Sequence, residues 1–252
     1  MKTPDQTGDR FAFVIPVFNH EEMVTKVIEA ALRHGFPIFV VNDGSTDTTP
    51  LKLADLNRIT VLNHESNQGK GAALKTGFLE AAKVADWAIT IDADGQHNPE
   101  DTVKLTSALN KGRKGIVIGI REGMEGENVP WTSRFGRHFS NFWVYISGGP
   151  LLKDTQSGFR IYPLPEILKL KTAGNRYQYE VEVLVKANWA GIDITEIPVS
   201  VSYSPGTKRI SHFKPFLDFM RNTLMFSFLI CQRILVPLPF RRRMIHNTSQ
   251  EN

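Results

Sequence analysis

The sequence predicts an α/β fold built on a mostly parallel sheet flanked by helices, and three observations point to it. Short apolar runs recur along the first half of the chain, segments with helical spacing separate them, and turn-forming clusters close them. Continuous apolar strands that alternate with helices are typical of a parallel sheet covered on both faces. The length of 252 residues favours one large domain or two small ones.

Five strands are expected in the first half, at residues 11–15, 38–41, 59–62, 87–91 and 115–119. Helices are expected at 23–32 and 71–84, and another begins at Asn98 as its cap, with Pro99 at the first position. The second half predicts helices at 131–147, 177–190 and 213–236, with one or two strands at 194–203 broken at Pro198. Ligands bind beyond the carboxyl ends of parallel strands, so the polar clusters at 19–21, 42–44 and 92–94 mark the expected site.

The composition excludes several classes of protein. Hydrophobic residues make up 41% and charged residues 22%, which is ordinary for a globular chain and excludes a disordered chain, a collagen and a coiled coil. Cys231 is the one cysteine, so neither an intrachain disulfide nor a cysteine zinc cluster can form, and a reducing compartment is favoured. No run of 18 apolar residues predicts a transmembrane helix, and residues 1–10 lack a signal-peptide core.

Basic charge is concentrated at the end of the chain. Residues 204–252 contain eight Lys or Arg and two acids, a net charge of +6, whereas the first 203 residues have a net charge of −2. A basic tail favours phosphates, an anionic membrane surface or nucleic acid as partner. The tail lacks a nucleic-acid recognition motif or aromatics interleaved on a sheet, so nucleic acid is not expected.

Two acids follow the fourth expected strand. Asp92 and Asp94 are two residues apart, so their carboxylates point to the same side of the chain. Mutual repulsion between them would be relieved by a divalent cation, and hard oxygen ligands suit Mg²⁺ or Mn²⁺. The alternative is a solvated loop that happens to contain two acids.

A glycine-flanked lysine precedes the helix expected at 71–84. In the sequence Gly69-Lys70-Gly71 the glycines would let the backbone approach a ligand, and the lysine could reach a phosphate. The stretch matches neither the Walker A motif nor G-x-G-x-x-G. The alternative is a glycine turn with a surface lysine.

Four motifs in order give the chain a family resemblance: Val14 to Glu21, Val40 to Asp47, Asn67 to Gly71 and Ile91 to His97. Together they resemble family-2 glycosyltransferases, which have the Rossmann-like GT-A fold. Further segments are similar to the dolichyl- and polyprenyl-phosphate sugar transferases, including dolichol-phosphate mannosyltransferase: Gln96 to Glu100, Asp154 to Arg160, Tyr179 to Glu182, Gly191, and Glu196 to Val199. A fainter resemblance is to family-2 enzymes of aryl-polyene or lipid-modifying pathways.

The resemblance implies a donor site for a nucleotide-sugar. The nucleotide pocket would contain Pro16, Phe18, Asn19, Glu21, Asp43, Lys70 and Asp92. Asp43 would accept hydrogen bonds from the base, and Asp92 would hold the nucleotide side of the site. Asp94 and Gln96, with Asp92, would ligate Mg²⁺ or Mn²⁺ bridging the diphosphate, and Arg121 would hold the donor phosphates.

The same resemblance implies a lipid-linked acceptor bound through its phosphate. The acceptor-binding residues would be Arg134, Arg137, Asp154, Ser157, Lys208 and Arg209. His212 stands where the polyprenyl-phosphate branch usually has Lys, and Lys208 and Arg209 could supply that charge. The alternative for Arg134 and Arg137 is ordinary salt bridging on a helix face.

The acceptor determines whether a base is needed. A phosphate oxygen is already anionic near neutral pH, so cationic contacts and positioning could carry most of the catalysis. A hydroxyl acceptor on a glycan or lipid would need a base, for which Asp154 or Glu182 are the candidates; the alternative for Glu182 is a helix-surface acid. A non-catalytic nucleotide- or lipid-binding module on the same fold is a further alternative, and the intact set of acids argues against it.

The organisation predicted from these patterns is a catalytic domain at 1–212 and an amphipathic helix with a basic tail at 213–252. Apolar residues Phe213, Phe216, Leu217, Met220, Leu224 and Phe228 form a helical stripe. The family resemblance implies a metal-dependent inverting glycosyltransferase, and the stripe and basic tail predict that it is peripheral on the cytoplasmic face of the membrane. The alternative places the helix on the domain, on a second subunit, or on a membrane-protein partner.

Overall fold

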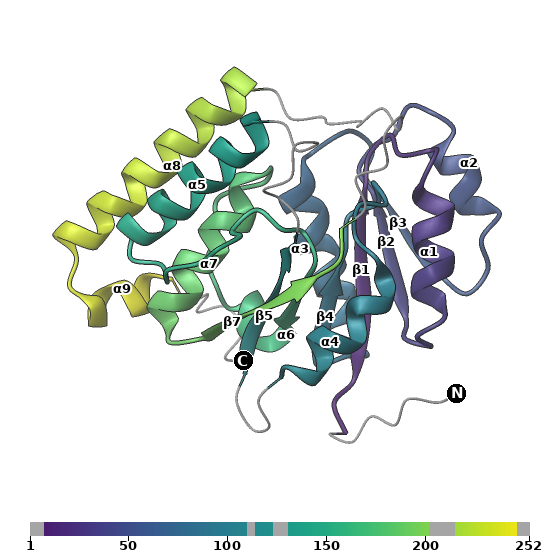
Figure 1. Cartoon of the computed structure of the whole chain (residues 1–252), viewed down its shortest axis with the longest axis horizontal. Helices are drawn as coiled ribbons and strands as arrows, with labels where there is room; N and C mark the ends of the chain where they lie inside the picture. The colour runs from purple at the N-terminus through teal and green to yellow at the C-terminus, as the bar shows by residue number, and fades with distance from the viewer. Residues whose placement is uncertain (1–7, 110–113, 123–130, 202–214, 246–252) are drawn as a thin grey trace.

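A seven-stranded sheet forms the centre of the computed structural model, which describes residues 8–109, 114–122, 131–201 and 215–245 (Figure 1). The strand order is β3-β2-β1-β4-β6-β5-β7. The strands are β1 (Phe11–Val17), β2 (Ile38–Asn42), β3 (Thr60–Asn63), β4 (Trp87–Thr90), β5 (Gly115–Arg121), β6 (Arg160–Pro163) and β7 (Asp193–Val199). β6 is antiparallel to both of its neighbours, and the other pairs are parallel. The predicted mostly parallel sheet is confirmed.

Helices follow most strands along the chain. They are α1 (Val24–Leu32), α2 (Thr49–Ala54), α3 (Lys70–Ala81), the 3₁₀ turn η1 (Pro99–Asp101), α4 (Thr102–Ser107), α5 (Trp131–Ile146), α6 (Leu164–Leu168), α7 (Gln178–Ala190), α8 (Pro215–Leu235) and α9 (Leu238–Met244). The side chain of Asn98 accepts a hydrogen bond from the backbone N–H of Glu100, as expected for a cap.

Alternation along β1 divides the core between the two faces of the sheet. Ala12 and Val14 belong to a cluster that includes Leu74 of α3 and Leu184 of α7, whereas Phe13 lies in a second cluster with α1 and α4 side chains. Both faces of the sheet are therefore covered, which explains why the strands are continuous apolar runs in the sequence.

Several elements differ from the sequence predictions. Pro198 does not break its strand: β7 is continuous and pairs Pro198 with Ile120 of β5, because an edge strand tolerates a missing N–H donor on its free side. β6 was not predicted, since its four residues begin with Arg160 and end with Pro163. α2, α6 and α9 are short helices that the spacing of apolar residues did not predict.

The C-terminal helices pack on the rest of the molecule. α8 lies beside α5 and contacts α7, and its Phe226 and Leu229 are buried (Figure 1). Arg233 donates hydrogen bonds to the carbonyl oxygens at the end of α5, and Arg242 of α9 donates to the carbonyl oxygen of Trp189. The stripe residues Met220, Leu224 and Phe228 are exposed, and Phe213 lies outside the described residues. One face of α8 is thus docked while another stays open.

None of the helices in the described part of the chain combines the length and the apolar character needed to cross a bilayer.

Candidate active site

The loops that follow β1 and β2 are tied to each other by side chains. The Asn19 amide oxygen accepts a hydrogen bond from the backbone N–H of Thr46 at 2.8 Å, and Asn19 itself adopts a positive φ of 53°. The Glu21 carboxylate accepts from the hydroxyl and the backbone N–H of Thr48, which lowers its pKa. Both residues, expected in the nucleotide pocket, therefore fix the position of the second loop.

The remaining residues expected from the first strand lie at its carboxyl end. Pro16 is buried inside β1 opposite Val41, and Phe18 is half-buried directly after the strand. Their predicted contact with a nucleotide stays a prediction.

Asp43 holds the glycine-rich segment onto the end of β2. Its carboxylate accepts hydrogen bonds from the backbone N–H groups of Gln68 at 2.9 Å and Gly69 at 2.7 Å, and it pairs with His64 Nδ1 at 2.7 Å. The side chain is 3% exposed. The structure thus gives Asp43 a loop-fixing role, and hydrogen bonding to a base stays a prediction.

The glycines around Lys70 allow the segment before α7 to pack closely against them. A Cβ on Gly69, whose φ is 106°, would lie 2.5 Å from the carbonyl oxygen of Asn175, and one on Gly71 would collide with Tyr179. The segment before α7 is therefore packed directly against the start of α3, and the backbone N–H of Ala72 donates to Asn175. The approach of this backbone to a phosphate stays a prediction.

Lys70 lies between two carboxylates. Its Nζ is 2.7 Å from Asp92 Oδ1 and 2.8 Å from Glu180 Oε1, and the three side chains are 16%, 28% and 7% exposed. We call Lys70, Asp92 and Glu180 the lysine centre. The structure places the Lys70 ammonium against Asp92, and its expected position beside the nucleotide stays a prediction.

Charge outweighs burial for the ammonium of the lysine centre. Burial acts to lower the pKa of Lys70, but the negative charges of Asp92 and Glu180 raise it above the ordinary value. Burial also opposes ionisation of Asp92, yet the adjacent ammonium lowers the pKa of that carboxyl. For Glu180 burial is the larger effect, so its pKa is raised.

The two acids after β4 are both partly accessible to solvent. Asp92 and Asp94 are half-buried and Ala93 between them is buried, and a common direction of the two carboxylates stays a prediction. Asp94 Oδ1 accepts a hydrogen bond from the backbone N–H of Gln96. Within the described residues no three His, Cys, Asp or Glu side chains gather into a metal-binding group. A cation here would need oxygen ligands from a substrate as well, which is the usual coordination of Mg²⁺.

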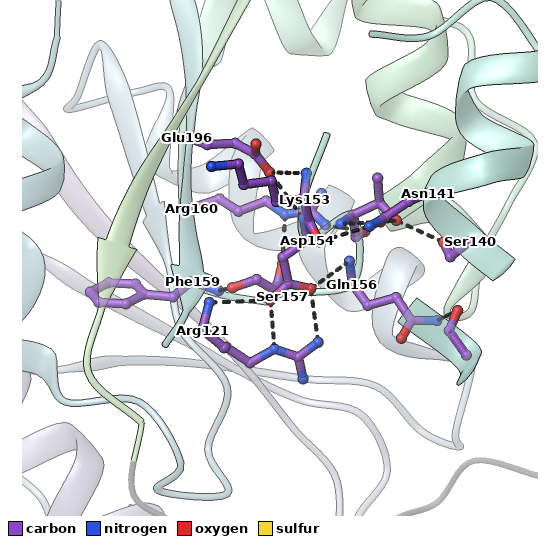
Figure 2. Close-up of polar contacts among 12 residues, drawn as sticks. Arg121, Ser140, Asn141, Lys153, Asp154, Gln156, Ser157, Phe159, Arg160 and Glu196 are labelled. Atoms are coloured by element: carbon purple, nitrogen blue, oxygen red, sulfur yellow. Dashed lines mark hydrogen bonds and ion pairs between the residues drawn. The ribbon is translucent and has the colours of Figure 1, made fainter. Parts of the chain in front are cut away.

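Arg121 forms a second buried ion pair at the end of β5. Its Nε and Nη2 contact Asp154 Oδ2 and Oδ1 at 2.7 and 2.8 Å, and the side chains are 10% and 1% exposed. Figure 2 shows Arg121 lying against Asp154 in this two-point contact. Burial opposes ionisation of Asp154, but the Arg121 hydrogen bonds and charge lower its pKa.

The segment that contains Asp154 is fixed from two sides. Glu196 of β7 accepts hydrogen bonds from the backbone N–H groups of Lys153 and Asp154, and Thr155 is bonded to Asn141 of α5 (Figure 2). Ser157 is fully buried, and its carbonyl oxygen accepts from Arg160 Nε. Ser157 therefore supports the chain at this point.

One arginine of α5 is buried close enough to Asp154 for its charge to act on that carboxylate. Arg137 is 9% exposed, its charge contributes to lowering the pKa of Asp154, and its buried Nε has no hydrogen-bond partner among the described residues. We call Arg121, Asp154 and Arg137 the arginine centre. Arg134 is half-buried one turn earlier, and Lys208 and Arg209 lie outside the described residues.

Glu182 lies apart from both centres. Its carboxylate accepts hydrogen bonds from the backbone N–H groups of Ala173 and Gly174 and contacts Lys186 at 2.6 Å. The acid of α7 that reaches Lys70 is Glu180, which the sequence reasoning missed. Positions 180 and 182 are two residues apart and therefore point to different sides of a helix. Which of the two acids faces Lys70 depends on how α7 is oriented against α3.

The chain is similar to known proteins over most of its length. The family described as "Glycosyl transferase family 2" matches residues 12–163. A UDP-N-acetylglucosamine–dolichyl-phosphate N-acetylglucosaminyltransferase from Methanococcus voltae is 30% identical over 230 residues, covering 81% of this chain and 92% of that protein. The polyprenol monophosphomannose synthase of Mycolicibacterium smegmatis is 28% identical over 212 residues, covering 76% and 77%.

Among solved structures, the fold is similar to glucosyl-3-phosphoglycerate synthase from Mycobacterium tuberculosis in complex with Mg²⁺ and UDP. The TM-score is 0.65 at 20% identity, over 91% of this chain and 81% of that one. Mannosyl-3-phosphoglycerate synthase from Rubrobacter xylanophilus gives a TM-score of 0.67 at 14% identity, over 97% and 78%. These likenesses support the fold.

Proposed function

The chain belongs to glycosyl transferase family 2, and from this premise we propose that it transfers a sugar from a nucleotide-sugar to the phosphate of a polyprenyl lipid, with inversion at the sugar carbon. The observation that carries the proposal is the arginine centre, where Arg137 is buried near the Arg121–Asp154 pair and its Nε has no hydrogen-bond partner in the described part of the chain. A buried guanidinium with unused donor capacity favours an anionic ligand. The dolichyl- and polyprenyl-phosphate activities of the relatives support a lipid phosphate as that ligand.

The donor side uses the acids at the end of β4. Asp94 and the Gln96 amide, with Asp92, supply hard oxygens that suit Mg²⁺ or Mn²⁺ when donor phosphates complete the shell. The bound cation would stabilise the negative charge that develops on the nucleoside-diphosphate leaving group. Asp43, Asn19 and Glu21 fix the loops around this point.

The contacts of the candidate bases favour a phosphate acceptor over a hydroxyl. The Asp154 carboxylate is bound at two points by Arg121, and its pKa is lowered, which makes it a weak base near neutral pH. The Glu182 carboxylate is bound by two backbone N–H groups and Lys186. An acceptor phosphate needs no proton removed, so positioning by guanidinium groups is sufficient.

We assign residues 1–212 to the catalytic domain and α8 and α9 to contact with the cytoplasmic face of an anionic membrane. In the described part of the chain, α5 has three exposed large apolar side chains, α8 has six and α9 has three. The other described residues together have five. Residues 219–245 contain Arg but no Asp or Glu. Apolar side chains flanked by unopposed positive charge are suited to an anionic lipid surface.

The proposed activity is tested by a donor and acceptor screen. Purified full-length protein is incubated with UDP- and GDP-sugars and MnCl₂ or MgCl₂, and sugar transfer is measured with dolichyl phosphate and with dolichol. We expect transfer to dolichyl phosphate only, and only with a divalent cation present. Equal transfer to dolichol would replace the phosphate acceptor with a hydroxyl, and transfer in the presence of EDTA would contradict the metal assignment.

A further inference from the structure

We propose that Glu180 is a positioning residue for the donor site: it takes up part of the Lys70 charge, so that Asp92 is oriented by the ammonium without being neutralised by it. The inference rests on the proposed divalent-cation site at Asp92 and Asp94. It concerns a residue of α7, about 90 positions away in sequence from the acids it would serve, and none of the four family motifs of the first half contains it.

The contacts of Lys70 give the reason. One ammonium is shared between Asp92 at 2.7 Å and Glu180 at 2.8 Å, so its positive charge is divided between the two carboxylates. Were Glu180 absent, Lys70 and Asp92 would form an isolated pair with no net charge. A carboxylate neutralised in this way attracts a cation less strongly than one that shares its counter-ion.

Glu180 is itself held rigidly. Its side chain is 7% exposed, and its backbone carbonyl oxygen accepts a hydrogen bond from Arg160 Nη1 at 2.8 Å. Arg160 is fully buried and also donates to the carbonyl oxygens of Thr155 and Ser157 and to the Tyr162 hydroxyl. The start of α7 is therefore bonded to the same segment that closes over Asp92.

That segment confines Asp92 from the other side. A Cβ on Gly158 would collide with the Asp92 carboxylate, so a larger residue there would force that carboxylate to move. Asp92 is thus enclosed between Lys70 and the Gly158 backbone, and its remaining freedom depends on where Lys70 lies. Since Lys70 is fixed by Glu180, a change at Glu180 reaches Asp92 without touching it. Supporting partners of this kind typically change metal affinity about 10–100-fold when mutated.

The test is Mn²⁺ binding in the presence of saturating UDP, measured by electron paramagnetic resonance on the whole chain. Glu180→Gln keeps the size of the side chain and removes its charge. We expect its Mn²⁺ dissociation constant to rise about 10-fold or more. The matched control is Glu182→Gln, the same substitution two positions along α7, which removes contacts to Ala173, Gly174 and Lys186 but none to Lys70. It should lower the unfolding temperature and leave Mn²⁺ affinity within about twofold.

A double variant separates positioning from a general loss of structure. Lys70→Met combined with Glu180→Gln removes one positive and one negative charge, so Asp92 has no ammonium beside it. We expect the double variant to regain much of the Mn²⁺ affinity that Glu180→Gln alone loses. If Glu180→Gln does not fold, the double variant is compared with Lys70→Met alone. Lys70→Met should then bind Mn²⁺ more tightly than the double variant, because it keeps the negative charge of Glu180.

Equal Mn²⁺ affinity in the unmodified protein and in folded Glu180→Gln would overturn this inference and leave the proposed function standing. No Mn²⁺ binding by the unmodified protein, with or without UDP, would overturn the cation site and the inference together.

Discussion

The arginine centre is more buried than the lysine centre, and the two centres also differ in which charge is in excess. In the lysine centre one ammonium contacts two carboxylates. In the arginine centre one carboxylate is bound at two points by Arg121. A second guanidinium, that of Arg137, has a donor that finds no partner among the residues that the structure describes. Excess carboxylate favours a cation and excess guanidinium favours an anion.

Residues 154–160 connect the two centres. Asp154 stands at one end of this segment, Gly158 encloses Asp92 near the other, and Arg160 binds carbonyl oxygens along it. The segment can therefore set the spacing between a cation-bound donor and an anionic acceptor. The variants below change one centre or its connection at a time.

The largest effect is expected from Asp94→Asn. The substitution keeps the size of the side chain and removes a charged ligand of the proposed cation. We expect turnover to fall about 100-fold or more, as when a major electrostatic stabiliser of a transition state is lost. The measurement is sugar transfer at saturating donor over a range of MnCl₂ concentrations, and undiminished turnover would remove Asp94 from the cation site.

A nearly equal effect is expected from Gly158→Ala. The added methyl group meets the Asp92 carboxylate, and a displacement of about 1 Å at a reacting centre costs about 100-fold in rate. Gly136→Ala is the control, because a Cβ there would have only the Gln156 side chain at 3.8 Å as neighbour. Equal transfer rates for the two variants would show that the segment does not govern Asp92.

A smaller effect is expected at the surface of the C-terminal helices. Leu224→Ser with Phe228→Ser should reduce the fraction of protein that co-sediments with anionic phosphatidylglycerol vesicles several-fold, since both substitutions remove apolar area from the exposed face of α8. High salt alone should release less protein, because each arginine contributes about 1 kcal/mol.

The control for that experiment is Leu51→Ser with Leu79→Ser, which changes two apolar side chains that are equally exposed but lie on α2 and α3. Unmodified protein that remains in the supernatant while forming a dimer would assign the exposed face to a second copy of the chain instead.

The smallest effect concerns acid stability. The pKa of Asp154 is lowered in the folded protein, so the Arg121–Asp154 pair stabilises the fold above the unfolded value of about 4, and this stability is lost as pH falls through the folded pKa. Asp154→Asn should therefore flatten the fall in unfolding free energy below about pH 4. Urea unfolding between pH 2 and 7 measures the slope, and an unchanged slope would mean that the pair contributes little.

Much of the fold could be predicted from sequence because its first half repeats a simple pattern. β1, β2 and β4 are buried on both faces, so each appears as an unbroken apolar run, and α1 shows clear helical spacing. β6 could not be found in this way, since Arg160 at its start looks like a loop residue until its buried hydrogen bonds to carbonyl oxygens are known.

The site was predicted as a set of residue types but not as a set of contacts. The motif around Lys70 indicated a phosphate ligand, whereas its partner Glu180 lies 110 positions later and becomes a neighbour only when α7 packs on α3. Likewise Arg121 and Asp154 were expected on different substrates, and the structure pairs them. The spacing of residues within a motif does not predict ion pairs between residues that are far apart in the sequence.

The most direct test of opposite charge preference in the two centres is calorimetric titration of a short-chain polyprenyl phosphate into unmodified protein and Arg137→Met. We expect the phosphate affinity of Arg137→Met to fall about 10–100-fold, because a charge-assisted hydrogen bond contributes about 1.5–3 kcal/mol, while the affinity for UDP with MnCl₂ stays unchanged. Equal phosphate binding by both proteins, or loss of UDP binding in the variant, would contradict the assignment of the arginine centre to the acceptor.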